Sequence, residues 1–463
     1  MIILDKSMNN STCRQRDDSE AISTLSRPQS SITLGEALPV WARIAALSFG
    51  GPAGQIAVMH RIIVEEKKWI GEHRFLQALN YCTLLPGPEA QQLATYIGWL
   101  MHRTKGGLLA GLLFVLPGLV SIMALSWIYV LLGKVSLVQG LFFGLKAAVL
   151  VIVVEALIRI GRRALKTNVL LALAGAAFVG IFFFGIPFPV IVIGAALIGW
   201  LVARSSPAQL GLKDDAVALI APAPDRWKQA GIASVIGLVA WWAPVALALL
   251  AFGPNHVLVS IGLFFSKLAV VSFGGAYALL AYMAQQAVET HHWMTAAEMV
   301  DGLGLAETTP GPLILVTQFV GFLAGFRDAA PFSPVTMGIL GAAMTTWVTF
   351  TPSMLWIFAG APFVEQLRAN KKLSGALAAI TAAVVGVILN LTVWFALHVL
   401  FGNVAERHTG WLRWYAFDLL ALDLRAASLA VIAGILAFRF HRSLIEVVGG
   451  MAALGIAMRY AFG

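Results

Sequence analysis

After residue 35 the chain alternates between long apolar stretches and short polar segments. Stretches without a charged side chain extend over residues 169–202 and 232–252. A helix that crosses the hydrocarbon core of a membrane needs about 20 apolar residues, and both stretches are long enough. The pattern therefore predicts an all-α, polytopic transmembrane protein embedded in a lipid bilayer.

Two segments of this pattern repeat each other. Ser48-Phe49-Gly50-Gly51, Trp69 and Pro86-Gly87-Pro88 return, each 224 residues later, as Ser272-Phe273-Gly274-Gly275, Trp293 and Pro310-Gly311-Pro312. A repeat of this length indicates a duplication. Each copy places Gly-Gly and Pro-Gly-Pro within apolar sequence, where they interrupt a helix. Paired interruptions at corresponding positions of two halves are typical of a transporter binding site.

The interruptions predict broken or re-entrant helices, and the remaining apolar stretches predict ordinary spans. The expected hairpins cover residues 38–64 and 75–101 in the first half and residues 257–289 and 296–326 in the second. The expected spans are residues 107–132, 137–160, 169–184, 187–202, 232–252, 335–360, 373–401, 411–438 and 444–462.

The same pattern divides the chain into segments. We expect a disordered cytoplasmic tail (1–35), a first repeat (36–203), a cytoplasmic linker (204–228), a connecting transmembrane helix (229–254) and a second repeat (255–463). Beyond the hairpins the halves align again with Pro117 opposite Pro352, which indicates an 11-residue insertion in the second half before Pro352.

The distribution of charge predicts how the halves are oriented. Lys67-Lys68 in the first half correspond to His291-His292 in the second. Because cytoplasmic loops are enriched in Lys and Arg, the two equivalent loops are expected on opposite faces, with the N-terminus in the cytoplasm. The halves are therefore predicted to form an inverted-topology repeat.

Composition excludes several other classes. Hydrophobic residues make up 59% and charged residues 12% of the chain, against about 25% charged residues in a globular domain. The net charge of +9 follows from the bias of cytoplasmic loops, so we expect no nucleic-acid partner. Two cysteines cannot form a disulfide framework, and the nine scattered His residues predict no metal. We expect no cofactor.

The chemistry of the interruptions favours an anion. A helix that begins at a break exposes unpaired N–H groups, glycine allows close approach to the backbone, and the positive helix end attracts negative charge. The alternative is that these motifs are only packing kinks. The candidate ligands are Ser48, Gly50, Gly51, Gln55, Pro86, Gly87, Gln91, Ser272, Gly274, Gly275, Tyr277, Thr309 and Gly311.

Charged side chains near the breaks supply further candidates. Arg43 and Lys267, each five residues before a Ser-Phe-Gly-Gly motif, are candidate counter-charges for an anion; alternatively they reach to the nearer interface. Glu89, Glu155 and Glu307 are candidate proton carriers. Glu155 has a structural alternative, an ion pair with a residue four positions on.

The motifs resemble those of the chromate ion transporter family, in particular its long-chain, two-domain bacterial members. The resemblance rests on Phe49–Gln55, Leu84–Pro88 with Gln91, Phe273–Tyr277 and Thr309–Pro312, and covers about residues 36–463. It implies secondary active export of chromate from the cytoplasm across the inner membrane, and chromate resistance. A homodimer is left open.

Three other functions are weighed against this one. Sulfate or related oxyanion uptake uses the same chemistry, because sulfate and chromate share charge and shape. An anion channel would use facing helix ends as a filter. An enzyme would need a nucleophile, metal or base cluster, and the sequence shows none; it also lacks a P-loop for direct use of ATP. We therefore expect a transporter and not an enzyme.

Overall fold

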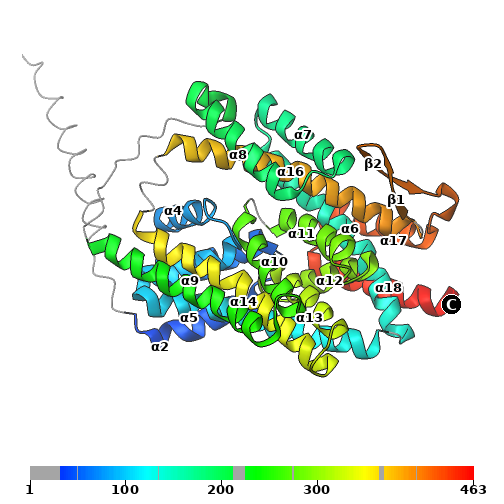
Figure 1. Cartoon of the computed structure of the whole chain (residues 1–463), viewed down its shortest axis with the longest axis horizontal. Coiled ribbons are helices and arrows are strands. Elements are labelled where there is room, and N and C mark those ends of the chain that lie inside the picture. Colours follow the sequence, from blue (N-terminus) through cyan, green and yellow to red (C-terminus); the bar gives the residue numbers. More distant parts are fainter. Residues whose placement is uncertain are drawn as a thin grey trace, which may run out of the picture.

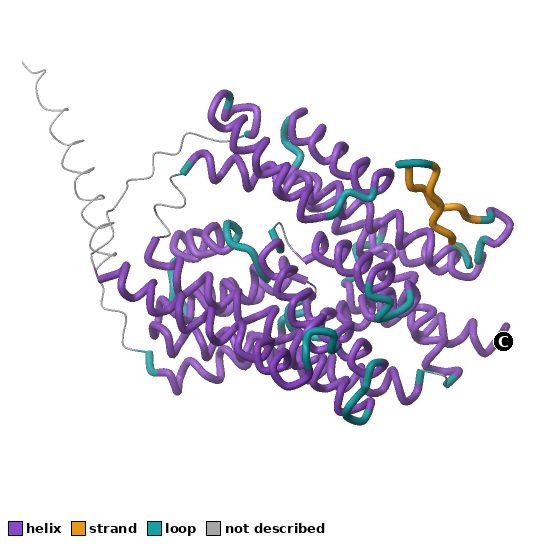
Figure 2. Tube along the Cα trace, in the orientation of Figure 1, coloured by secondary structure: helices purple, strands orange, loops and turns teal. Residues whose placement is uncertain are grey.

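The computed structural model describes residues 32–49, 51–133, 135–211, 225–273, 276–363, 370–402 and 404–462. The predicted tail thus lies almost wholly outside the described residues. Residues 212–224 of the predicted linker also lie outside them. Helices form most of the described chain, and the only strands described are a pair near the C-terminus (Figures 1 and 2).

The elements come in two series joined by one helix. The first series is α2 (Leu34–Leu47), α3 (Gly51–His60), η1 (Arg61–Glu66), α4 (Glu72–Cys82), α5 (Glu89–Leu132), α6 (Ser136–Ala164), α7 (Asn168–Phe184), α8 (Phe188–Ser205) and η2 (Pro207–Leu210). The joining helix is α9 (Asp225–Phe252). The second series is α10 (Val257–Val271), α11 (Ala276–Gln285), η3 (Gln286–Thr290), α12 (Ala296–Thr308), η4 (Leu313–Leu315), α13 (Val316–Arg327), α14 (Pro334–Gly360), η5 (Ala361–Phe363), α16 (Lys371–Leu400), β1 (Val404–Thr409), β2 (Leu412–Phe417), η6 (Leu419–Ala421), α17 (Leu424–Gly434), η7 (Ile435–Arg439) and α18 (Leu444–Phe462).

The two series repeat each other in detail. In each, a helix ends at the Ser-Phe-Gly-Gly motif, and the helix that follows closes with a π-helical turn, η1 in the first half and η3 in the second. Each π turn leads to a non-glycine residue with positive φ, Lys68 at 53° and His292 at 52°. These two residues are 224 positions apart, so the backbone preserves the duplication even where the side chains differ.

Local capping chemistry explains several helix starts. Thr33 and Glu36 form a capping box at α2, in which the Glu36 carboxylate accepts the Thr33 N–H at 2.8 Å. Thr295 and Glu298 form the same box at α12. Such boxes satisfy N–H groups that the first helical turn leaves unpaired.

Helix α5 is a hairpin rather than one straight span. His102 and Arg103 have non-helical backbone angles, and a Cβ at Gly98 would overlap the main chain of Gly106. The chain therefore turns back on itself, which matches the end of the predicted hairpin 75–101 and the start of the predicted span 107–132. In the second half, α13 and α14 form the corresponding hairpin, where Gly321 lies against Gly341.

The two halves are interlocked by reciprocal packing. Helix α6 of the first half packs against α17 and α18 of the second, while α16 of the second half packs against α7 and α8 of the first. Figure 1 shows α7, α8 and α16 side by side. Small residues permit these contacts: a Cβ at Gly144 would overlap Met451, and one at Gly199 would overlap Gly375. Neither half can cover its own helices alone.

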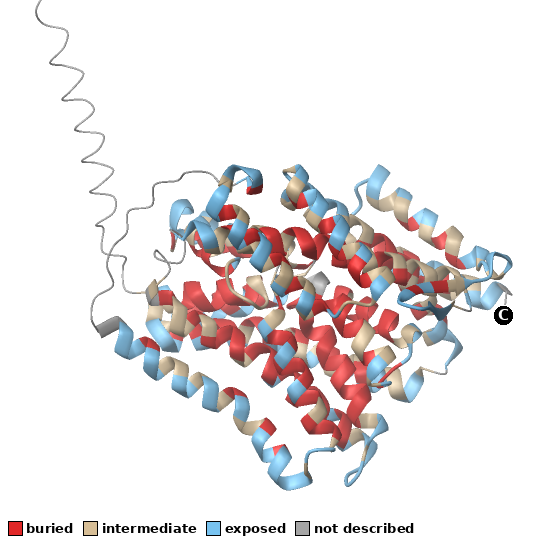
Figure 3. Cartoon of the chain, turned by 45° about the horizontal axis from the view of Figure 1, so that its top comes forward, coloured by how far each residue is buried: buried red, intermediate tan, exposed pale blue. Residues whose placement is uncertain are grey.

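By length and composition, six helices of the described chain could cross a membrane. They are Glu89–Leu132, Ser136–Ala164, Phe188–Ser205, Trp227–Phe252, Lys371–Leu400 and Leu444–Ala461. Exposed apolar side chains cover several of them, for example Leu250 and Val235 on α9, while buried residues fill the centre of the molecule (Figure 3). The prediction of an all-α polytopic membrane protein is confirmed.

The predicted span over residues 411–438 is wrong. Residues 404–417 form a β-hairpin, which turns at Gly410 (φ 63°), and the rest of the stretch holds only the short turn η6, the short helix α17 and the π turn η7. The charges of this segment explain why it does not cross. Arg413 is buried, but its guanidinium donates to the carbonyls of Ile181 (2.7 Å) and Phe182 (3.3 Å) at the end of α7. The hairpin therefore caps a helix C-terminus.

Candidate functional site

The helix breaks of the two halves meet through reciprocal backbone hydrogen bonds. The Gly87 N–H donates to the Ser272 carbonyl at 3.0 Å, and the Gly311 N–H donates to the Ser48 carbonyl at 2.8 Å. Gly87 (φ 130°) and Gly311 (φ 95°) occupy backbone conformations that only glycine adopts readily. Each Pro-Gly-Pro break therefore lies against the Ser-Phe-Gly-Gly break of the other half.

Glutamine side chains stabilise the open carbonyls of these breaks. Gln55 donates through Nε2 to the Gly311 carbonyl at 2.6 Å, and Gln92 donates to the Pro86 carbonyl at 2.8 Å. Gln318 donates to the carbonyl of Leu119 at 3.0 Å. Among the described residues, the Oε1 atoms of all three glutamines are buried without a hydrogen-bond partner. The site thus holds unused polar groups, which is costly away from water unless a ligand or water pairs with them.

Each Pro-Gly-Pro break also contacts the kinked helix of the other half. A Cβ built at Gly118, next to Pro117 of α5, would overlap the Pro310 carbonyl and Leu315. The equivalent residue of α14 is Ser353, whose Oγ lies 3.3 Å from the Cβ position of Gly87. Ser353 donates to Gln91 Oε1 at 2.5 Å, and Gln91 donates to Thr95 at 3.1 Å. The predicted ligand Gln91 therefore lies beside the first Pro-Gly-Pro break.

The predicted hydroxyl ligands lie at the breaks but bond to their own helices. Ser48 donates to Ile44 (2.6 Å), Ser272 to Ala269 (2.8 Å) and Thr309 to Ala306 (3.2 Å), each through a backbone carbonyl. All three side chains are buried. Because each hydroxyl hydrogen is donated to a backbone carbonyl, only the hydroxyl oxygen is left to accept a hydrogen bond at the site.

Some predicted ligands lie outside the described residues. Gly50, Gly274 and Gly275 are among them, and for Tyr277 only the helical backbone is described. Gly51 begins α3 with φ 71° and is buried.

The two predicted cations contact other side chains in the structure. Arg43 lies 2.7 Å from the Glu66 carboxylate, and half of its side chain is exposed. Lys267 is exposed, and its ammonium lies 5.9 Å from the centre of the Tyr282 ring. Both charges therefore have partners other than a ligand at the breaks.

The three predicted carboxylates occupy different surroundings. Glu89 is the first residue of α5 and is partly buried, directly after Pro86-Gly87-Pro88. Glu307 is buried in the last turn of α12. Glu155 and Arg159 lie 3.8 Å apart on the surface of α6, as the structural alternative for that residue predicted.

A charged cluster that the sequence analysis did not single out as a site joins α6, α12 and α5. Lys146 Nζ lies 3.3 Å from Asp301 Oδ1, and the Tyr129 hydroxyl donates to Asp301 Oδ2 at 2.9 Å. Asp301 is buried. The available signal was Lys146 within an otherwise apolar span, but its partner lies 155 positions away in the sequence. The described residues contain no group of three or more His, Cys, Asp or Glu placed to hold a metal.

The architecture defines a class of protein: a polytopic helical membrane protein in which the helix breaks of two homologous halves are bonded to each other. The chain belongs to the chromate transporter family. The model of that family, described as chromate transporter, matches residues 36–200 and 259–456.

Named relatives agree with this family. The chain is 32% identical to the chromate transport protein of Pseudomonas aeruginosa over 75% of this chain and 77% of that protein. It is 28% identical to the chromate transport protein of Cupriavidus metallidurans, over 79% and 83%. It is 29% identical to a probable chromate transport protein of Synechococcus elongatus, over 76% and 81%. No solved structure matches the chain.

Proposed function

We propose that this protein is a secondary active transporter that exports chromate from the cytoplasm across the inner membrane and confers chromate resistance. The observation that carries the proposal is the reciprocal bonding of Gly87 to Ser272 and of Gly311 to Ser48, which joins each Pro-Gly-Pro break to the Ser-Phe-Gly-Gly break of the other half. Relatives named as chromate transport proteins support the choice of substrate.

In the proposed site, chromate is held without a metal. The N–H groups of the first turn of α5 lack helical partners and carry the positive end of the helix dipole. Thr309, Gln55 and Gln91 lie at the breaks and supply further polar atoms. The amides of Gly87 and Gly311 hold the breaks together, so their role in the site is structural. The proposed site does not include Arg43 and Lys267, because Arg43 pairs with Glu66 and Lys267 lies over the ring of Tyr282.

We propose further that the halves form an inverted-topology repeat with the N-terminus in the cytoplasm. The loop with Lys67 and Lys68 carries two positive charges. In the equivalent loop, burial lowers the pKa of His291, and the neighbouring His292 lowers it further, so this loop is much less positive at neutral pH. The positive-inside bias then assigns the two loops to opposite faces.

Labelling of single cysteines tests the topology. In a background without Cys13 and Cys82, cysteines replace Glu66 and Thr290, which flank the two equivalent loops. An impermeant thiol reagent added to intact cells is expected to label only the cysteine at position 290. Equal labelling of both positions contradicts an inverted repeat.

Transport in everted membrane vesicles tests the function. Because the cytoplasmic face of these vesicles points outward, an exporter takes up labelled chromate. Uptake is expected to depend on this protein and to stop on addition of an uncoupler. Uptake that persists with an uncoupler favours a channel, and full competition by equimolar sulfate favours a general oxyanion transporter. A homodimer stays a prediction, which cross-linking in the same membranes tests.

A further inference from the structure

One ion pair between the halves lies among apolar helices and has no role in the site described so far. Lys146 belongs to α6, a span of the first half, and Asp301 belongs to α12 of the second half. Their charged atoms lie 3.3 Å apart. The side chain of Asp301 is 8% exposed and that of Lys146 26%. The pair is therefore shielded from water on the carboxylate side and accessible on the ammonium side.

Stability does not explain this pair. Taking two charges out of water costs several kcal/mol for each ion, and apolar residues of similar size are often equally stable. The duplication makes the same point, because the counterpart of Asp301 is Gln77 and that of Lys146 is Thr381. The other half thus builds the equivalent elements without either charge. Ionisable residues within a membrane region that are not needed for folding indicate transport.

The pair is connected to the helix breaks along two routes. Asp301 lies two helical turns, about 12 Å, before Thr309, and Leu145, next to Lys146, lies 3.4 Å from the Cβ position of Gly304. The second route uses Tyr129, whose ring lies 5.2 Å from that of Phe319.

Phe319 is adjacent to Gln318, which bonds to the carbonyl of Leu119. Leu119 follows Gly118, the residue that touches Pro310. A continuous series of packed side chains therefore connects Asp301 with the second Pro-Gly-Pro break.

The remaining charges around Asp301 are balanced. Glu298, one turn earlier on α12, pairs with Arg327 of α13 at 2.5 Å. Helix α16 also packs against α12, and it carries no charged residue from position 373 to 397. Lys146 from α6 and Tyr129 from α5 are thus the groups that face the carboxylate.

We propose that Asp301 carries the proton that accompanies the transported anion, and that Lys146 supplies the positive charge that the divalent anion requires. In the empty protein the carboxylate neutralises Lys146. In the state that opens the carboxylate side to water, Asp301 Oδ1 takes up a proton, and the released Lys146 ammonium attracts the dianion. Proton and anion then cross together with one net negative charge, which an inside-negative membrane potential drives outward. After both leave, the Lys146–Asp301 pair forms again. This inference rests on the proposed transport of chromate.

Proton movement and exchange, measured on the full chain in proteoliposomes, test the proposal. Potassium and valinomycin clamp the membrane potential, and a dye reports external pH. Chromate added to wild-type vesicles is expected to make the outside alkaline, relative to vesicles without protein. Asp301→Asn imitates the protonated acid, so labelled chromate is expected to exchange for internal chromate while the chromate-dependent proton movement is lost. In the empty Asp301→Asn variant the Lys146 ammonium has no carboxylate partner. The empty transporter is therefore expected to reorient slowly across the membrane.

Two further variants separate charge from folding. Lys146→Gln is expected to raise the half-saturating chromate concentration at least about tenfold. Asp301→Glu keeps the carboxylate and is expected to restore proton movement. Glu446→Gln breaks an exposed ion pair with Arg442 (3.9 Å) and serves as the matched control, with wild-type behaviour. Thermal unfolding in detergent shows which variants are folded, and the double variant Asp301→Asn, Lys146→Gln leaves no unpaired buried charge.

Two results overturn the inference while leaving the transport function intact. One is chromate-dependent proton movement of wild-type size in Asp301→Asn. The other is an unchanged half-saturating concentration in both Lys146→Gln and the double variant. If wild-type vesicles take up no chromate, the proposed function and this inference both fail.

Discussion

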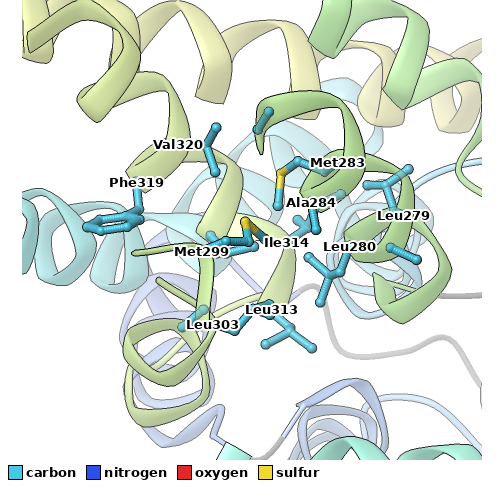
Figure 4. Packing of buried hydrophobic residues seen from close by; sticks show 14 of the residues in the cluster. Leu279, Leu280, Met283, Ala284, Met299, Leu303, Leu313, Ile314, Phe319 and Val320 are labelled. Carbon is cyan, nitrogen blue, oxygen red and sulfur yellow. The ribbon is translucent and has the colours of Figure 1, made fainter. Parts of the chain in front are cut away.

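The two Pro-Gly-Pro breaks have the same sequence pattern and different surroundings. Residues 83–89 around the first break are all partly or fully exposed, whereas Thr309 and residues 311–325 at the second are buried. Figure 4 shows Leu279, Met283, Met299 and Ile314 in one apolar cluster, and Ile314 follows the second break by two residues. Helix α4 before the first break exposes many side chains, while α12 buries every residue from Met299 to Glu307.

The two duplicated breaks therefore differ in solvent exposure within one molecule. A transporter must open its site to one side while closing it to the other, and homologous halves that exchange roles achieve this. Under the proposed inverted repeat, the exposed first break and the enclosed second break would correspond to a protein that is open on one side only. The Lys146–Asp301 pair lies on the enclosed side. In the proposed mechanism, the protonation of Asp301 therefore accompanies the opening of that side.

The largest expected effect comes from filling the contact at the second break. Gly118→Val places a branched side chain against Pro310 and Leu315. Overpacking of this kind costs about 1–3 kcal/mol, and we expect transport to be abolished because α5 and the second Pro-Gly-Pro break are forced apart. Vesicle uptake normalised to protein level measures the effect. Gly175→Val, at an exposed glycine of α7 with open space around it, is the control and is expected to transport normally.

The next effect comes from making the halves more alike. The counterpart of Gln55 is Leu279, so Gln55→Leu gives the first half the residue of the second. The Gly311 carbonyl then loses its partner in a buried place, which costs about 1–3 kcal/mol. We expect a lower unfolding temperature in detergent and slower uptake. Wild-type values for both would show that the bond between Gln55 and Gly311 contributes nothing.

A smaller effect concerns access to the breaks. Leu85 and Thr309 are counterparts, and Leu85 is partly exposed while Thr309 is buried. In a background without Cys13 and Cys82, we expect Leu85→Cys to react with a small thiol reagent several-fold faster than Thr309→Cys. Reaction rates in membranes with and without chromate measure this. Equal rates would contradict the unequal burial of the two breaks.

The smallest effect is expected at the peripheral cations. Arg43→Gln removes an exposed ion pair with Glu66, and such pairs contribute about 0–1 kcal/mol. We expect the half-saturating chromate concentration to stay unchanged in Arg43→Gln and Lys267→Gln. A marked increase of the half-saturating concentration in either variant would show that this cation does contribute to the anion site.

The sequence predicted the features that depend on local pattern. The apolar runs predicted the helices, and the constant spacing from Gly87 to Gly311 predicted the duplicated breaks. Apart from the local pair of Glu155 and Arg159, it did not predict which partners the charged side chains have. Arg43 bonds Glu66 and Lys146 bonds Asp301, and both contacts depend on how helices pack in three dimensions. The β-hairpin was missed because the aromatic residues Trp411, Trp414 and Phe417 imitate an apolar span, although the charges among them exclude it.

The interlocked packing of the two halves has a consequence for biosynthesis. A ribosome releases the chain from its N-terminus onward, so α6 enters the membrane long before α18 exists. Gly140 and Gly144 of α6 lie against the main chain of Gly455 and Met451, near the C-terminus. The small-residue face of α6 must therefore wait, exposed to lipid, until synthesis is nearly complete. The first half thus acquires its final structure only when the last helix is released.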